Sequence, residues 1–513
     1  MNSNQRKTWF IAFVVSLGGF LFGFDAGIIS GVMSYAGPEF NLNENQIGWV
    51  TSSPSFAAMI AMLISGRLSD LIGRKAILII VAFLYAISAL LSAYAGSYEM
   101  LYLSRMLGGL AFGAALILAP TYIAEISTAE NRGKLVSMQQ LNIVFGFFAA
   151  FLSNYYFNAA NTSGTEFLTD ENVWRWMLGV ELIPAVLYFV MMFFVPKSPR
   201  WLYLTGKIDE AKLVLNKLFG TRAEQEIEAI AESIKAQQHT KGVHISELFK
   251  SSLKFIVIVG LVIGVLQQIT GINAIYFYAT SIFKQTGIGT DAAFSSGILL
   301  SVTSVVFTIV SMLLIDKLGR RPLLLAGIAG IAISMLVCGY GFNTATYELT
   351  ATEITQLENL DQDKLRSIEG VVYDSDVAFK NAAKTSLGTE VYNKHEGPIL
   401  AAATNMNATL VLIGILGFIA CFAFSLGPVM WVMLSGLYPT KYRGLAIGVI
   451  AFVNSFASWV VQQLFPWELS NLGGAVTFFV FGFIALFGFF VLLKILPETK
   501  GKSLEEIEAE LVK

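Results

Sequence analysis

The chain has 513 residues, of which 55% are hydrophobic and only 14% are charged. Soluble domains usually carry about 25% charged residues, so this composition excludes an ordinary water-soluble fold and predicts a membrane protein. The formal net charge of −2 gives no indication of nucleic-acid binding. Both cysteines lie inside apolar runs, where we expect core thiols rather than a disulfide.

Long apolar segments recur along the whole chain. A helix needs about 20 mostly apolar residues to cross a bilayer, and lipid-exposed backbone at that depth must be helical because no water can satisfy it. We therefore expect an all-α membrane protein with twelve transmembrane helices. The twelve segments are 9–34, 47–66, 76–96, 100–124, 134–158, 175–195, 254–283, 294–315, 322–342, 406–435, 445–467 and 473–496.

The basic residues are distributed unevenly between the two sides of this arrangement. Lysine and arginine concentrate in the cytoplasmic loops of membrane proteins. With the N-terminus in the cytoplasm, the loops on that side hold most of the basic residues, while the long loop 343–404 on the opposite side has more acidic than basic residues. We therefore expect a multi-pass protein of the cytoplasmic (inner) membrane with both termini in the cytoplasm.

A charged segment, 197–252, separates the spans into two groups of six. Within it, residues 209–219 and 224–238 have the pattern of short amphipathic helices at the cytoplasmic face. We expect an N-terminal bundle in 1–196, a helical linker in 197–252, and a C-terminal bundle in 253–513 that carries an extracytoplasmic insertion at 343–404.

The two groups of spans repeat each other. Asp70-Leu-Ile-Gly-Arg-Lys75 follows the second span, and Asp316-Lys-Leu-Gly-Arg-Arg321 follows the eighth. Arg132-Gly133 opens the fifth span, and Arg443-Gly444 opens the eleventh. The polar segment 343–404 interrupts this repeat, which supports its assignment as an insertion into a duplicated plan.

Further motifs lie at the ends of the expected helices, in a fixed order. With the two motifs above, they make the chain resemble the sugar porter family of the major facilitator superfamily, closest in pattern to bacterial proton-coupled, xylose-type sugar symporters. The resemblance implies two six-helix bundles around a central site that opens to each side in turn. The further motifs are Pro120-Thr-Tyr-Ile-Ala-Glu125, Pro196-Lys-Ser-Pro-Arg-Trp-Leu202, Gln267-Gln-Ile-Thr-Gly-Ile-Asn273, Gly427-Pro-Val-Met-Trp431 and Pro497-Glu-Thr-Lys-Gly501.

Three ionisable residues, Asp25, Arg105 and Glu181, lie within expected spans, where a charge costs roughly 2.5–3.5 kcal/mol. Asp25 lies opposite a ridge of glycines spaced by four residues, which favours close packing of another helix on the ridge and would direct Asp25 toward the central cavity. The resemblance implies that Arg105 is its partner, that Asp25 carries a proton, and that Glu181 tunes the site. Structural ion pairs are the alternative.

Sugar recognition favours amides, which donate and accept hydrogen bonds, and aromatic faces. In a straight helix Gln268 and Asn273 would point in different directions, but Gly271 could let the helix unwind and turn both inward. Gly427-Pro428 could interrupt the tenth span in the same way. The alternative is that these polar groups merely join helices. The positions that match sugar-contacting positions of the family are Gln140, Gln267, Gln268, Asn273, Trp431 and Asn454.

Charged residues at the cytoplasmic helix ends form the third predicted set. We expect them to form salt bridges that hold the two bundles together when the site opens outward, with anchoring by the positive-inside rule as the alternative. The set comprises Asp70, Arg74, Glu125 and Arg132 in the first half and Asp316, Arg320, Arg321 and Arg443 in the second.

The sequence therefore predicts a transporter, not an enzyme, that moves a monosaccharide by alternating access in symport with protons. A facilitative uniporter and a transporter-like sugar sensor are the alternatives. We expect no cofactor or metal, no nucleic-acid partner, and a monomer in contact with membrane lipid. Phe277 and Ser455 stand where the family favours tyrosine and tryptophan, so xylose, glucose, galactose and arabinose all stay open as substrates.

Overall fold

The computed structural model describes residues 3–128, 131–238, 245–249 and 251–498. Within these ranges twelve helices are long and apolar enough to cross a membrane, and each overlaps one predicted span. The prediction of an all-α protein with twelve transmembrane helices is therefore confirmed. A two-stranded antiparallel pair, β1 (Thr346–Tyr347) with β2 (Thr404–Asn405), lies in the insertion.

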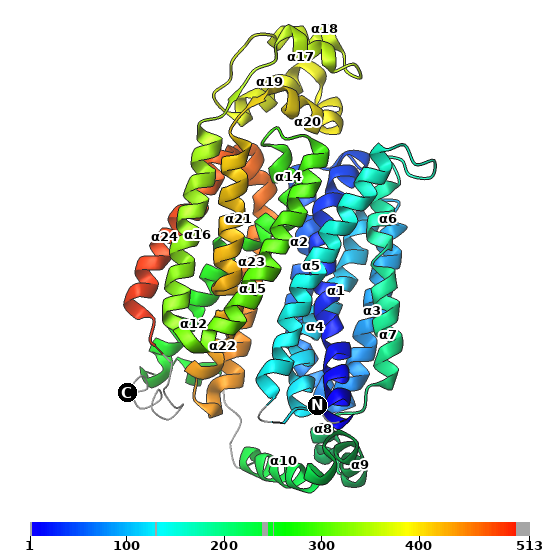
Figure 1. Ribbon diagram of the computed structural model, residues 1–513, viewed down its shortest axis with the longest axis vertical. Coiled ribbons are helices and arrows are strands. Elements are labelled where there is room, and N and C mark those ends of the chain that lie inside the picture. Colours follow the sequence, from blue (N-terminus) through cyan, green and yellow to red (C-terminus); the bar gives the residue numbers. More distant parts are fainter. Residues whose placement is uncertain (1–2, 129–130, 239–244, 250, 499–513) are drawn as a thin grey trace.

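The first six spans form one bundle, coloured blue to teal in Figure 1. The sixth span is interrupted at Val180–Glu181, where Pro184 cannot donate the helical hydrogen bond to the Val180 carbonyl. The spans of this bundle are α1 (Ser3–Glu39), α2 (Glu44–Ile72), α3 (Arg74–Ala93), α4 (Tyr98–Glu125), α5 (Arg132–Thr162), and α6 (Val173–Gly179) with α7 (Leu182–Phe194).

The last six spans form the second bundle, which meets the first along α2 and α23 and along α5 and α15. Two of its spans are interrupted, each near the predicted substrate motif. The spans are α12 (Ser251–Ile269) with α13 (Ile272–Phe277), α15 (Thr290–Leu318), α16 (Arg320–Asn343), α21 (Ala408–Phe424) with α22 (Leu426–Leu437), α23 (Thr440–Asn471) and α24 (Gly473–Ile495). The short α14 (Ala279–Lys284) continues the seventh span.

The glycine ridge of α1 packs against α5. A Cβ atom at Gly23 would lie 2.0 Å from the Ile143 carbonyl oxygen, and one at Gly27 would lie 2.8 Å from the Ala150 Cβ. The absence of side chains on the ridge therefore lets the two backbones approach more closely than any other residue would allow. This contact also fixes the rotation of α1, so Asp25 faces the opposite side.

The linker forms short helices at the end of the molecule where α1 begins and α24 ends (Figure 1). The predicted helices at 209–219 and 224–238 are confirmed as α9 (Ile208–Phe219) and α10 (Ala223–Gln238). The other short elements are α8 (Pro199–Leu204), η1 (Gly220–Arg222) and α11 (Ile245–Leu248). We call this end of the molecule the linker end.

The insertion is a folded cap at the opposite end of the molecule, which we call the cap end (Figure 1). Its own apolar core includes the fully buried Leu365, Phe379 and Tyr392. Asp376 accepts a hydrogen bond from the Gly474 amide at 3.3 Å, which attaches the cap to the start of α24. The cap comprises β1, α17 (Ala351–Gln356), α18 (Gln362–Leu365), η2 (Arg366–Ile368), α19 (Asp376–Leu387), α20 (Thr389–Ala403) and β2.

Candidate functional site

Two helix breaks shape the middle of the C-terminal bundle. Gly271, between α12 and α13, has a φ of 97°, which a glycine adopts without steric strain, so the predicted unwinding at this residue is confirmed. In the tenth span the break falls at Ser425 rather than at Gly427-Pro428. Pro428 instead lies in the first turn of α22, where a missing N–H costs little.

Because the helix breaks at Gly271, side chains from α12 and α13 converge with one from α23. The Gln268 side-chain amide donates to Asn454 Oδ1 at 3.1 Å, and Asn273 donates to Gln268 Oε1 at 2.8 Å. Asn454 in turn donates to Gln267 Oε1 at 2.8 Å and to the Gly264 carbonyl at 2.7 Å. Four of the predicted substrate residues therefore form one hydrogen-bonded group, which we call the amide cluster: Gln267, Gln268, Asn273 and Asn454.

The amide cluster is buried and its members satisfy one another. Gln267, Gln268 and Asn454 are at most 8% exposed. A buried amide without a partner costs about 1–3 kcal/mol, so these mutual bonds stabilise the unliganded site. Hydroxyl groups both donate and accept, so a polyol can exchange with the amide–amide bonds one for one and leave no buried group unpaired.

The other two predicted substrate residues lie outside the amide cluster. Gln140, on α5, is half-buried, and Trp431, on α22, is 38% exposed. No hydrogen bond between either side chain and the amide cluster is found among the described residues. Sequence reasoning instead missed two members of the polar group on α23. Ser458 accepts from Asn273 at 2.6 Å, and Gln462 donates to Ser458 at 2.8 Å. Asn454, Ser458 and Gln462 follow one another at intervals of four residues, which places them on one helix face and is the signal that could have found them.

Asp25 and Arg105 form a buried ion pair between α1 and α4. Two hydrogen bonds of 3.0 and 3.3 Å join the guanidinium to the two carboxylate oxygens, and Arg105 Nε also donates to the Val50 carbonyl at 3.2 Å. Asp25 is 5% exposed and Arg105 is 1% exposed. Asp25 therefore points into the interior of the N-terminal bundle and not into the space between the bundles, which differs from the expected direction because α4 and α2 occupy that side of α1.

Glu181 lies at the interruption between α6 and α7 and is 3% exposed. It interacts electrostatically with both Asp25 and Arg105, although no hydrogen bond to either of them is described. The three predicted ionisable residues therefore belong to one buried group. That group lies in the N-terminal bundle, whereas the amide cluster lies in the C-terminal bundle.

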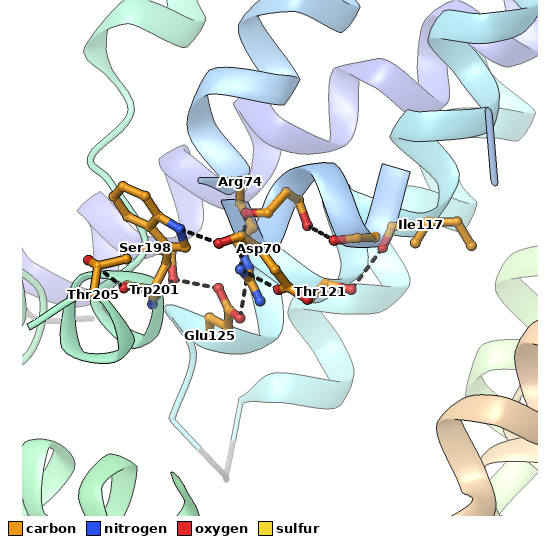
Figure 2. A network of polar contacts seen from close by, with 10 residues as sticks. Asp70, Arg74, Ile117, Thr121, Glu125, Ser198, Trp201 and Thr205 are labelled. Atoms are coloured by element: carbon orange, nitrogen blue, oxygen red, sulfur yellow. Dashed lines mark hydrogen bonds and ion pairs between the residues drawn. The ribbon is translucent and has the colours of Figure 1, made fainter. Parts of the chain in front are cut away.

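At the linker end, three residues of the predicted gate meet within the N-terminal bundle. Arg74 contacts Asp70 at 2.8 Å and Glu125 at 3.2 Å, and Ser198, the residue that caps the start of α8, donates to Glu125 (Figure 2). Trp201 donates to the Asp70 carbonyl at 3.0 Å. This network joins α2, α3, α4 and the linker.

The remaining predicted gate residues lie at the ends of α5, α15, α16 and α23. Arg132 is exposed at the start of α5, and Arg320 is half-buried at the start of α16. Arg321 donates to the Leu493 carbonyl at 3.0 Å, and Arg443 donates to the Tyr438 carbonyl at 3.2 Å. The side chain of Asp316 lies outside the described residues. Among the side chains that the structure describes, the ion pairs of Asp70, Arg74 and Glu125 lie within the N-terminal bundle, and salt bridges across the bundles stay a prediction.

Most of the described hydrogen bonds between the bundles lie toward the cap end, although Ser455 also donates to the Met62 sulfur at 3.4 Å near the middle of α2 and α23. Ser30 pairs with Thr280 at 2.9 Å, and Asn158 donates to Asp291 at 2.7 Å. Between α2 and α23, Ser52 and Ser55 donate to two successive glutamines. We call the contacts toward the cap end the outer seam. These contacts hold the bundles together at the cap end.

A cavity of about 540 Å³ lies between α1, α5 and α7. Its lining is apolar apart from Asn142, and Phe13 and Leu187 beside it are about half exposed. It contains none of the predicted substrate residues. We therefore assign it to the lipid-facing surface rather than to the sugar site.

Twelve membrane-crossing helices in two bundles, with a buried polar group in each bundle and hydrogen bonds across the interface between them, define a membrane transporter of the major facilitator fold. The chain belongs to the sugar transporter family, whose model, "Sugar (and other) transporter", matches residues 11–356 and 387–511. The unmatched stretch between these two ranges, 357–386, lies inside the cap.

Individual relatives agree with this assignment. The arabinose-proton symporter of Bacillus subtilis is 33% identical over 504 residues, covering 98% of this chain and 95% of that protein. The galactose-proton symporter of Escherichia coli is 33% identical over 516 residues, covering 100% of this chain and 96% of that protein. The solved inward-open conformation of the xylose transporter XylE from E. coli superposes with a TM-score of 0.75 at 28% identity, covering 98% of this chain and 100% of that one.

Proposed function

We propose that this protein moves a monosaccharide across the cytoplasmic membrane in symport with protons. The observation that carries the proposal is the amide cluster, a buried set of paired donors and acceptors at a helix break, which suits a ligand rich in hydroxyl groups. Relatives named as symporters of arabinose and galactose with protons support the substrate class and the coupling.

Transport proceeds by alternating access. The outer seam closes the cap end in this structure, so the site opens toward the linker end. In the opposite state the outer seam separates, and the charged residues at the linker end join the bundles. No ion pair of Arg132 or Arg443 across the bundles is found among the described residues. In the opposite state Arg443 is available for Glu125, and Arg132 for acidic groups of the C-terminal bundle.

Asp25 carries the coupled proton. Its carboxylate neutralises Arg105 in a site that excludes water, so protonation of Asp25 breaks the pair and frees the guanidinium. Release of the proton restores the pair. Because Arg105 also binds the Val50 carbonyl of α2, the change reaches a helix of the outer seam.

The linker end faces the cytoplasm and the cap faces outward, as the distribution of basic residues predicts, and the protein acts as a monomer. Reconstituted liposomes test the whole proposal. Purified protein should accumulate one or more of xylose, glucose, galactose and arabinose when a pH gradient, acidic outside, is imposed. Uptake that stops at equal concentrations would mean a uniporter, and binding without uptake of any sugar in the panel would mean a sensor.

A further inference from the structure

Two successive glutamines of α23, Gln462 and Gln463, hold α2 at the outer seam. Ser55 donates to Gln462 Oε1 at 3.0 Å, and Ser52 donates to Gln463 Oε1 at 2.8 Å. Ser52 and Ser55 lie three residues apart, so they occupy neighbouring positions on one face of α2. The two contacts are chemically the same, a serine hydroxyl donating to a glutamine carbonyl across the two bundles.

The two glutamines differ in what their amide nitrogens bind. Gln462 is fully buried, and its Nε2 donates to Ser458, which also accepts from Asn273 of the amide cluster. Gln463 Nε2 instead donates to the Asn45 carbonyl at 3.1 Å, at the end of α2. The contact between Ser55 and Gln462 is therefore linked to the amide cluster through the Ser458 hydroxyl. The contact between Ser52 and Gln463 has no such link among the described hydrogen bonds.

Ser458 fixes the orientation of the Gln462 amide. A glutamine amide presents a donor and an acceptor on opposite edges, so the bond from Nε2 to Ser458 aims Oε1 at Ser55. The Tyr278 hydroxyl donates to the Gln462 backbone carbonyl at 2.9 Å and holds that turn of α23 against α13 and α14. A ligand that accepts from the Asn273 amide replaces the bond between Asn273 and Ser458, so the alignment of Gln462 with α2 then depends on whether the ligand itself donates to Ser458.

We propose that Gln462 is a positioning residue that couples occupancy of the amide cluster to closure of the outer seam. A sugar hydroxyl that accepts from Asn273 can donate to Ser458, which keeps Gln462 aligned and favours closure over the loaded site. Gln463 contributes to closure independently of the ligand. This inference rests on the proposed function, because it requires a sugar at the amide cluster.

The two glutamines supply a matched experiment. Labels at Tyr94 and Asn471, exposed residues near the cap ends of α3 and α23, report the open and closed populations by electron paramagnetic resonance after Cys338 and Cys421 are replaced. The distribution of distances between the two labels is measured without sugar and with a transported sugar at saturating concentration. In the otherwise unaltered protein, sugar should raise the closed-to-open ratio by about fivefold or more, the usual lower range of coupling between sites.

Gln463→Leu should lower the closed-to-open ratio equally with and without sugar, so the effect of sugar on the ratio is kept. Gln462→Leu should lower the ratio and also reduce the effect of sugar to nearly one. Ser55→Ala and Ser52→Ala remove the same two contacts from α2 by a smaller change, and they should reproduce the results for Gln462 and Gln463 respectively. These serine variants decide the question if Gln462→Leu fails to fold.

The inference is overturned if the Gln462 and Ser55 variants keep the full effect of sugar, since Gln462 would then be only a contact of the seam. It is also overturned if the unaltered protein transports sugar without any change in the ratio. A protein that binds and transports none of the sugars would instead refute the proposed function, and the inference with it. Sugar uptake and the label distances therefore separate the two failures.

Discussion

The carboxylate of Asp25 and the guanidinium of Arg105 face each other across α1 and α4, joined by hydrogen bonds of 3.0 and 3.3 Å in the interior of the N-terminal bundle. The glycine ridge of α1 makes this possible, because it fixes the rotation of the helix against α5 and leaves Asp25 facing α4. Packing of the glycine face of α1 against α5 thus places the Asp25 carboxylate, on the opposite face of α1, next to Arg105.

Replacement of Asp25 by asparagine is expected to abolish accumulation of sugar driven by a pH gradient. Asparagine resembles protonated aspartate in shape but cannot release a proton, so sugar binding and exchange should persist. The unpaired charge of Arg105 should also lower thermal stability, since breaking a buried ion pair costs about 3–5 kcal/mol. Liposome uptake, counterflow and thermal unfolding measure the three effects.

Glu181→Gln is the matched control, because it removes a buried carboxylate of the same group without removing the partner of Arg105. It should shift the pH dependence of uptake but keep accumulation. Persistent accumulation by the Asp25→Asn protein would make Asp25 structural and Glu181 the next candidate for the proton site.

Gln268→Ala and Asn273→Ala are each expected to weaken sugar binding by about 1–3 kcal/mol, because each leaves a ligand hydroxyl and a neighbouring amide without a partner. Isothermal titration of purified protein with the transported sugar checks this. Gln46→Ala provides a control on a distant amide that caps α2, and it should leave affinity unchanged. Wild-type affinity in both cluster variants would exclude the amide cluster as the sugar site.

Removal of the whole cap is expected to leave the transport core folded. Thr346 and Asn405 are partners in the short antiparallel pair, so a short glycine-serine linker can replace residues 347–404 without moving α16 or α21. Deletion of 365–395 alone should be far more disruptive, because it takes Phe379 and Tyr392 out of the cap core and exposes the rest. Size-exclusion profiles and uptake rates compare the two deletions, and loss of folding in both would show that the cap supports the bundles.

Gly23→Ala is expected to destabilise the N-terminal bundle by at least about 1–3 kcal/mol, because the added Cβ would lie 2.0 Å from the Ile143 carbonyl oxygen and the backbones would have to separate. Gly66→Ala, where a Cβ meets nothing within 4 Å, is the control and should be neutral or slightly stabilising. Thermal unfolding in detergent distinguishes them, and equal stability would mean that α1 and α5 can separate without cost.

The sequence alone determined the features that depend on local composition. The number and approximate positions of the spans follow from the length of apolar runs, and the break at Gly271 follows from a residue that tolerates positive φ. The linker helices at 209–219 and 224–238 follow from amphipathic spacing. These properties are set within one segment, so no knowledge of its neighbours is needed.

The tertiary structure decided which side chains meet. Ser458 and Gln462 bond to the amide cluster, and Asp25 faces α4 rather than the space between the bundles. Arg74 pairs with both Asp70 and Glu125 inside the N-terminal bundle. The cap, whose sequence is largely polar, buries an apolar core of its own. Each of these outcomes depends on helix rotation and on which end of the interface between the bundles is closed, and those are set by packing energies between segments distant in the chain.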